Sequence, residues 1–205
     1  TPFVKLMNKR IYNILMVASR YDMFILEDDG RVDEQIFNEY TSLNLRYPPR
    51  FTQVSNNKEA LAELKQNHYE LIICMPNMDT GETFVLAKQL KKDYPSIPVV
   101  LLTPFSKAVT QSLSREDLSG IDYVFSWLGD TDLLLAIIKL IEDHMNVEHD
   151  VKTVGVQTIM LVEDSVRFYS SVLPLLYKFV LSESKEFSKE ALNEHLQMLR
   201  MRGRP

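Results

Sequence analysis

The sequence has little cysteine, glycine or tryptophan: one, six and one residues, respectively, among 205. The single cysteine, Cys74, cannot form a disulfide within the chain, and we expect a reducing, cytoplasmic location. Positive charge is also scarce, since 23 lysines and arginines face 28 aspartates and glutamates and the net charge is −5. An acidic protein has no field that holds nucleic acid non-specifically, so a nucleic-acid-binding function is disfavoured.

Long apolar runs are missing as well. No stretch approaches the roughly 18 apolar residues that a membrane-spanning helix needs, so we expect no membrane partner. The first ten residues contain no apolar signal-peptide core. The chain starts at Thr1 rather than at a methionine, and we expect it to be a piece of a longer polypeptide.

The residues that are present suit a globular α/β protein, with 45% hydrophobic and 25% charged residues. Short apolar or β-branched runs alternate with stretches whose apolar residues recur at helical spacing. Such alternation predicts a parallel sheet between two layers of helices. The expected strands are 13–18, 51–55, 70–75, 99–103 and 121–127. The expected helices are 32–45, 58–66, 80–93, 106–118 and 132–144, with residues 19–30 irregular.

The remainder of the chain predicts a second, smaller unit. We expect residues 11–146 to form the first domain, 147–156 a polar linker, and 157–205 the truncated start of another α/β unit. That start would be a strand at 157–162 followed by helices at 166–181 and 182–202. A strand and two helices cannot bury their own apolar faces, so this part must pack on the first domain or on a second copy.

Four motifs in the first domain are familiar. They are Tyr-Glu-Leu-Ile-Ile (69–73), Met-Pro-Asn-Met-Asp-Thr-Gly (75–81), Ile-Pro-Val-Val-Leu-Leu-Thr (97–103) and Gly-Ile-Asp-Tyr-Val (120–124). With them, residues 11–146 resemble the receiver domain of two-component response regulators. The resemblance implies a flavodoxin-like fold, a five-stranded doubly wound parallel sheet of order 2-1-3-4-5.

The resemblance also implies where a phosphoryl-transfer site would lie. A working receiver has an acidic pair that binds Mg²⁺, an aspartate that accepts phosphate, a serine or threonine, and a lysine. Here the acidic pair falls on Ala18 and Ser19, the acceptor on Met75 (or Cys74 after a one-residue slip), and the lysine on Ser126. Only Thr103 matches, and we expect it to hydrogen-bond the neighbouring loop. The first domain therefore resembles a degenerate receiver that has kept the scaffold and lost the chemistry.

Other carboxylates could stand in for the missing ones. Glu27, Asp28 and Asp29 could form a displaced metal site, although a solvated acidic turn closed by Gly30 is the simpler interpretation. Asp79 could be a displaced phosphoacceptor, although a carboxylate at the start of the next helix would also favour the helix dipole.

The second unit keeps an acidic pair, Glu163-Asp164, in the stretch Ile-Met-Leu-Val-Glu-Asp-Ser. This matches the opening of a receiver, so Mg²⁺ is expected there only in a longer protein that supplies the rest of the site. Residues 157–181 are similar to the N-terminal region of bacterial proteins of the phosphoenolpyruvate synthase or pyruvate phosphate dikinase type. None of that family's catalytic residues lies in this chain.

Three functions are compatible with these observations. The first is a non-catalytic regulatory module that acts by protein contact through residues 106–144, the signalling face of receivers. The second is a genuine phosphorelay receiver that uses Mg²⁺ and a displaced aspartate. The third is a flavodoxin-like small-molecule-binding domain, but no hydroxyl- and glycine-rich loop follows the first strand. We also expect a homodimer through 157–205, formed by packing or strand exchange.

Overall fold

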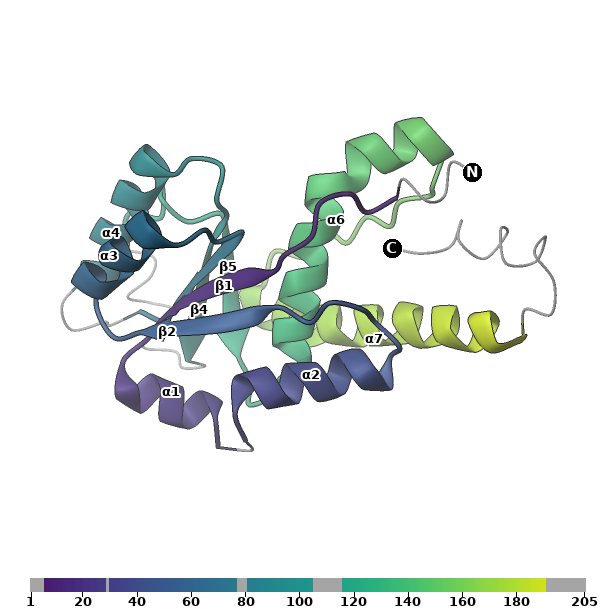
Figure 1. Cartoon of the computed structure of the whole chain (residues 1–205), viewed down its shortest axis with the longest axis horizontal. Coiled ribbons are helices and arrows are strands. Elements are labelled where there is room, and N and C mark those ends of the chain that lie inside the picture. The colour runs from purple at the N-terminus through teal and green to yellow at the C-terminus, as the bar shows by residue number, and fades with distance from the viewer. Residues whose placement is uncertain (1–5, 29, 77–80, 105–115, 191–205) are drawn as a thin grey trace.

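The centre of the molecule is a five-stranded parallel sheet (Figure 1). The computed structural model describes residues 6–28, 30–76, 81–104 and 116–190, with side chains as far as residue 186. The strand order is β2-β1-β3-β4-β5, which confirms the predicted flavodoxin-like topology. The strands are β1 (Asn13–Val17), β2 (Arg50–Val54), β3 (Leu71–Cys74), β4 (Val99–Pro104) and β5 (Tyr123–Trp127).

Helices cover both faces of this sheet. They are α1 (Arg20–Leu26), α2 (Val32–Ser42), α3 (Asn57–Gln66), α4 (Glu82–Asp93), α6 (Asp132–Val154) and α7 (Val166–Glu190). Helices α3 and α4 share one apolar cluster with the sheet, while α1, α2, α6 and α7 share the other. The predicted helix 106–118 lies mostly outside the described residues.

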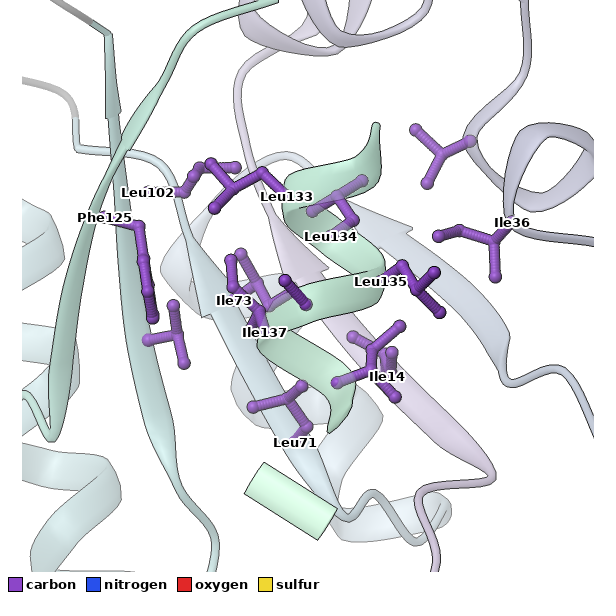
Figure 2. Packing of buried hydrophobic residues seen from close by; sticks show 14 of the residues in the cluster. Ile14, Ile36, Leu71, Ile73, Leu102, Phe125, Leu133, Leu134, Leu135 and Ile137 are labelled. Atoms are coloured by element: carbon purple, nitrogen blue, oxygen red, sulfur yellow. The ribbon is translucent and has the colours of Figure 1, made fainter. Parts of the chain in front are cut away.

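The central strands consist almost entirely of buried apolar residues, because both faces of a parallel sheet are covered. Strand β3 is buried at every position, whereas the edge strand β2 has exposed or half-buried residues throughout. Figure 2 shows Leu133, Leu134 and Ile137 of α6 among the side chains of β1, β3 and β4. Each such fully buried side chain stabilises the fold by about 1.5–3 kcal/mol.

Residues 20–26 form helix α1, so the prediction that 19–30 is irregular was wrong there. Ser19 begins the helix, since its hydroxyl oxygen accepts a hydrogen bond from the Asp22 N–H at 3.1 Å. Met23 and Leu26 are buried on the core side of α1. Serine is among the residues preferred at this capping position.

Helix α6 continues through Val154, so residues 147–154 of the predicted linker are helical. Three polar side chains on one side of α6 explain the extension, because they bind the main chain of the N-terminal segment. Glu142 accepts from the Ile11 N–H at 3.0 Å, and Asn146 accepts from the Lys9 N–H at 2.9 Å. Asp150, one turn further along, accepts from the Met7 N–H at 3.2 Å.

The predicted strand at 157–162 is absent, and residues 155–165 have no regular secondary structure. Part of this segment lines a cavity of about 520 Å³ with α6 and α7, where no strand offers its N–H and C=O groups for pairing. Helix α7 is continuous through Pro174 to Glu190, so the predicted break at 181–182 was also wrong. The rest of the predicted last helix lies outside the described residues.

Candidate functional site at the carboxyl edge of the sheet

The ends of β1 and β3 meet at the edge where doubly wound proteins bind their ligands. Ala18 and Met75 follow these strands, and both are buried in the same apolar cluster. Their main chains continue the sheet, since the Met75 N–H donates to the Val17 carbonyl oxygen at 2.9 Å. A methyl group and a thioether therefore stand where a working receiver carries a metal-binding carboxylate and a phosphoacceptor.

Cys74 cannot substitute for Met75. Its side chain is fully buried in the apolar cluster on the opposite face of the sheet. This burial raises the pKa of the Cys74 thiol to about 12, so the thiol is protonated and unreactive at neutral pH. Ser19, at the other acidic position, donates its hydroxyl to Asp22 Oδ2 at 2.6 Å and is occupied in capping α1.

The residues at the ends of β4 and β5 are also buried and hydrogen-bonded within the fold. Thr103 is buried, and its hydroxyl donates to the Phe125 carbonyl oxygen at 3.2 Å. The prediction placed this bond on a neighbouring loop, but the acceptor belongs to the neighbouring strand β5. Ser126, at the lysine position, is buried too, and its N–H donates to Ser170 Oγ of α7 at 2.9 Å.

The carboxylates that could replace the missing ones are dispersed or lie outside the described residues. Glu27 ends α1 and accepts from Gln53 Nε2 at 3.2 Å, beside a shallow hollow whose lining includes the ion pair of Arg31 and Asp33. Asp28 is exposed, whereas Asp29 and Asp79 fall outside the described ranges. Within these ranges, no group of three or more histidine, cysteine, aspartate or glutamate side chains could hold a metal ion.

The acidic pair of the second unit lies just before α7. Glu163 accepts from the Ser165 N–H at 2.9 Å, and Asp164 is exposed. Ser165 Oγ accepts from the Phe168 N–H at 3.4 Å, as a helix-capping serine does. Negative charge is favourable at the start of a helix, so the pair stabilises α7 in this arrangement.

Helix α7 covers β5 and one side of α6, an arrangement that the sequence analysis only offered as one of several options (Figure 1). Leu173, Tyr177 and Leu181 are buried in the shared core cluster. The Tyr169 ring lies 5.7 Å from the Phe125 ring, measured between centroids. Ser170 and the three buried residues are spaced 3, 4 and 4 residues apart, a helical pattern from which this buried face of α7 could have been predicted.

Polar contacts fix the same interface. Tyr177 donates its hydroxyl to Asp143 Oδ2 at 2.6 Å, and Lys178 pairs with Asp132 at 2.6 Å. Burial raises the pKa of Asp143 to about 6, although the hydrogen bond from Tyr177 opposes the rise. Within the predicted partner face at 106–144, β5 and one side of α6 are thus covered by the chain's own helix.

Comparisons with known proteins found similar solved structures only. No protein-family model matches the chain, and no curated protein matches it. Among solved structures, the receiver domain of a signal transduction histidine kinase from Syntrophus aciditrophicus is 22% identical, with a TM-score of 0.48, and covers 74% of this chain and 99% of its own. The receiver domain of an HD domain-containing protein from Pseudomonas fluorescens Pf-5 is 18% identical, with a TM-score of 0.45, and covers 69% and 94%.

A third similar structure is the response regulator TrrA from Thermotoga maritima in complex with Mg²⁺ and BeF, which is 18% identical with a TM-score of 0.45. It covers 63% of this chain and 98% of its own. In the part of the chain that the structure describes, no helix combines the length and apolar character that crossing a membrane requires.

Proposed function

We propose that this chain is a regulatory, receiver-like module of a two-component-type signalling or phosphotransfer protein, and that it acts by protein contact without aspartyl phosphorylation. The supporting observation is the chemistry at the strand ends of a receiver-type sheet. Ala18, Met75 and Ser126 are buried and carry no carboxylate or cation at the three positions that need one. The described sheet keeps the strand order of that fold while these three positions lack the reacting groups, so we propose that the module acts without a catalytic site of its own.

The physical chemistry of phosphoryl transfer supports this proposal. A hard cation such as Mg²⁺ requires oxygen ligands, which Ala18 cannot provide. An acyl phosphate requires a carboxylate nucleophile, and the Met75 thioether is not one. The charge that develops on the phosphoryl group requires a nearby cation, and the Ser126 side chain has none. Thr103 alone, with its hydroxyl donated to the main chain of β5, supplies none of these functions.

Incubation with Mg²⁺ and the small phosphodonor phosphoramidate, followed by intact-mass spectrometry, tests the proposal. We expect no phosphoryl adduct, and a working receiver domain treated in parallel provides the positive control. A stable adduct that disappears in the Asp79→Asn variant would overturn the proposal in favour of a genuine receiver with a displaced aspartate. An adduct that survives this substitution but is lost after Asp28→Asn and Asp29→Asn would place the acceptor in the acidic turn.

Trp127 offers a second readout at the same edge of the sheet. It is the only tryptophan, it is 7% exposed, and it follows Ser126 directly. We expect its fluorescence to stay constant when Mg²⁺ and then beryllium fluoride are added. A saturable change that requires both additions, and that fluoride alone does not produce, would contradict the loss of the phosphoryl site.

The proposal extends to partners. Since α7 covers β5, we propose that contacts are made through surfaces that α7 leaves open, including a homodimer through 157–205. We also propose that the chain belongs to a larger protein with a downstream domain of the phosphoenolpyruvate synthase type, on the sequence resemblance of 157–181 alone. To test that assignment, the intact protein would be isolated from its source and its termini identified by mass spectrometry. A natural protein that ends at Pro205 would refute it.

A further inference from the structure

The outer face of α7 carries a stripe of large apolar side chains in contact with solvent. Phe168, Val172, Leu175 and Phe179 are 60%, 41%, 68% and 65% exposed, respectively. Their spacing of 4, 3 and 4 residues places them on one side of the helix, opposite the side that packs on β5 and α6. We call these four residues the α7 stripe.

The segment that precedes the helix also exposes large apolar side chains. Met160 and Val162 are 87% and 83% exposed, so large apolar side chains gather in both elements. Scattered surface hydrophobic residues need no explanation, but a contiguous row usually marks an interface. On the inner face of α7, the buried Ser170 hydroxyl accepts a hydrogen bond from the Ser126 N–H of β5, so a specific contact fixes the orientation of the helix.

The geometry points to a second copy of this chain as the occupant, with the two α7 helices packed in parallel along the α7 stripe. Spacing of 4-3-4 is the a/d pattern of a two-stranded coiled coil, in which Phe168 and Leu175 take d positions and Val172 and Phe179 take a positions. This inference deepens the homodimer proposed above and does not depend on whether the module is phosphorylated.

Charges beside the stripe select the orientation. Lys178 takes a g position and Glu183 the following e position, and both side chains are exposed. In a parallel pair, each Lys178 faces Glu183 of the partner subunit, which is the attractive g–e′ arrangement. An antiparallel pair in the same apolar register would instead place Lys178 beside Ser171 of the partner subunit and form no ion pair. Lys178 keeps Asp132 as its partner within the chain.

The rest of the domain leaves room for this pairing. The residues that hold α7 to its own domain, Leu173, Tyr177 and Leu181, lie at the b, f and c positions on the far side of the helix. Pro174 lies at a c position, so it is not part of the a/d seam. Two domains would therefore sit on opposite outer sides of the paired helices, and neither would have to move its core.

Sedimentation equilibrium of the full chain tests the inference. We expect a dimer, and we expect Leu175→Glu to weaken its association at least about 100-fold, because each copy would bury a charge in an apolar seam. Val85→Glu is the matched control: Val85 on α4 is 67% exposed, so the same charge is added at a similarly exposed apolar position. This control should associate like the wild type, and Trp127 fluorescence should confirm that both variants are folded.

Orientation is tested by cross-linking. Leu175→Cys adds one accessible thiol to a chain whose own Cys74 is fully buried. A parallel seam brings the two copies of residue 175 together, so oxidation should give a disulfide-linked dimer. An antiparallel seam would instead cross-link only a mixture of the Leu175→Cys and Val172→Cys variants, and that result would refute the parallel arrangement.

Glu183→Lys should weaken the dimer about tenfold by placing Lys178 opposite a like charge. A wild-type chain that remains monomeric at high micromolar concentration would overturn the inference and assign the α7 stripe to another partner. A dimer that tolerates Leu175→Glu would overturn it too. Neither outcome bears on the phosphorylation test, so the two proposals fail separately.

Discussion

Replacement of Ser170 by alanine should loosen α7 from β5. Ser170 Oγ accepts the hydrogen bond from the Ser126 N–H at 2.9 Å and itself donates to the Val166 carbonyl oxygen at 2.7 Å. Both serines are buried, with 1% and 8% of their surface exposed. In the Ser170→Ala variant the Ser126 N–H keeps its burial and loses its acceptor, which costs about 1–3 kcal/mol.

Part of that loss is hidden by helix propensity. Alanine is a better helix former than serine by about 0.5 kcal/mol, so the net destabilisation of Ser170→Ala should be about 0.5–2.5 kcal/mol. Ser171→Ala is the matched control, because Ser171 lies next in the same helix and donates to the Phe168 carbonyl oxygen at an exposed position. The propensity gain is common to both variants, and the difference between their unfolding free energies isolates the buried hydrogen bond.

Urea unfolding followed by Trp127 fluorescence measures this difference, since Trp127 directly follows Ser126 in the sequence. Hydrogen exchange at the Ser126 amide provides a local readout and should be faster in Ser170→Ala than in Ser171→Ala. Equal unfolding free energies and equal exchange rates in the two variants would refute the docking of α7 on β5 as described.

Three further substitutions probe other parts of the molecule. Burial raises the pKa of the Asp143 carboxyl to about 6, so the native state binds more protons than the unfolded state between about pH 4 and 6, and the wild type loses up to about 3 kcal/mol of stability as the pH rises through this window. Asp143→Asn should remove this loss. Urea unfolding at several pH values measures it, and a pH dependence of stability unchanged by the substitution would contradict the prediction. Gly120→Ala should destabilise by about 1–3 kcal/mol or more in thermal unfolding, because its Cβ would lie 2.5 Å from the main-chain carbon of Ala87; an unchanged melting temperature would exclude that close approach. Asn146→Ala should cost about 2 kcal/mol and expose the Lys9 amide to faster hydrogen exchange, since Asn146 binds both the N–H and the C=O of Lys9; retained protection there would refute the contact.

The sequence pattern predicted the elements that can be recognised from their own residues, such as the buried strands. Strands β1, β3 and β4 are apolar runs because helices cover both faces of the sheet, and such runs can be recognised in the sequence. The missed helix α1 has only seven residues, and its Tyr21 and Phe24 are 72% and 70% exposed. Its exposed aromatic residues obscure the apolar stripe by which a helix is normally detected.

Elements held by distant partners could not be predicted in the same way. The second half of α6 has a polar sequence, and its Asn146 and Asp150 are buried only because the N-terminal segment, over 130 residues away, binds them. The strand expected at 157–162 has suitable residues, but this segment lies beside α6 and α7 and does not pair with a strand of the sheet.

The candidate site shows the same division. The positions of Ala18, Met75 and Ser126 could be assigned from motifs that follow consecutive strands. The bond between Ser126 and Ser170 could not, because it depends on how α7 folds back onto β5. Sequence motifs identify the residues at the strand ends, but only the tertiary structure shows which of these residues are buried by other elements.

Helix α6 has a mechanical consequence. Its 23 residues form a rod about 35 Å long, and the row of Glu142, Asn146 and Asp150 binds the rod to the N-terminal segment beyond the end of the sheet. Helix α6 and the domain therefore rotate as one rigid body. A rotation of the domain by only about 10° would move the far end of such a rod by about 6 Å. A small rotation of the module would thus reach a partner bound at the far end of α6 as a displacement larger than the rise of one helical turn.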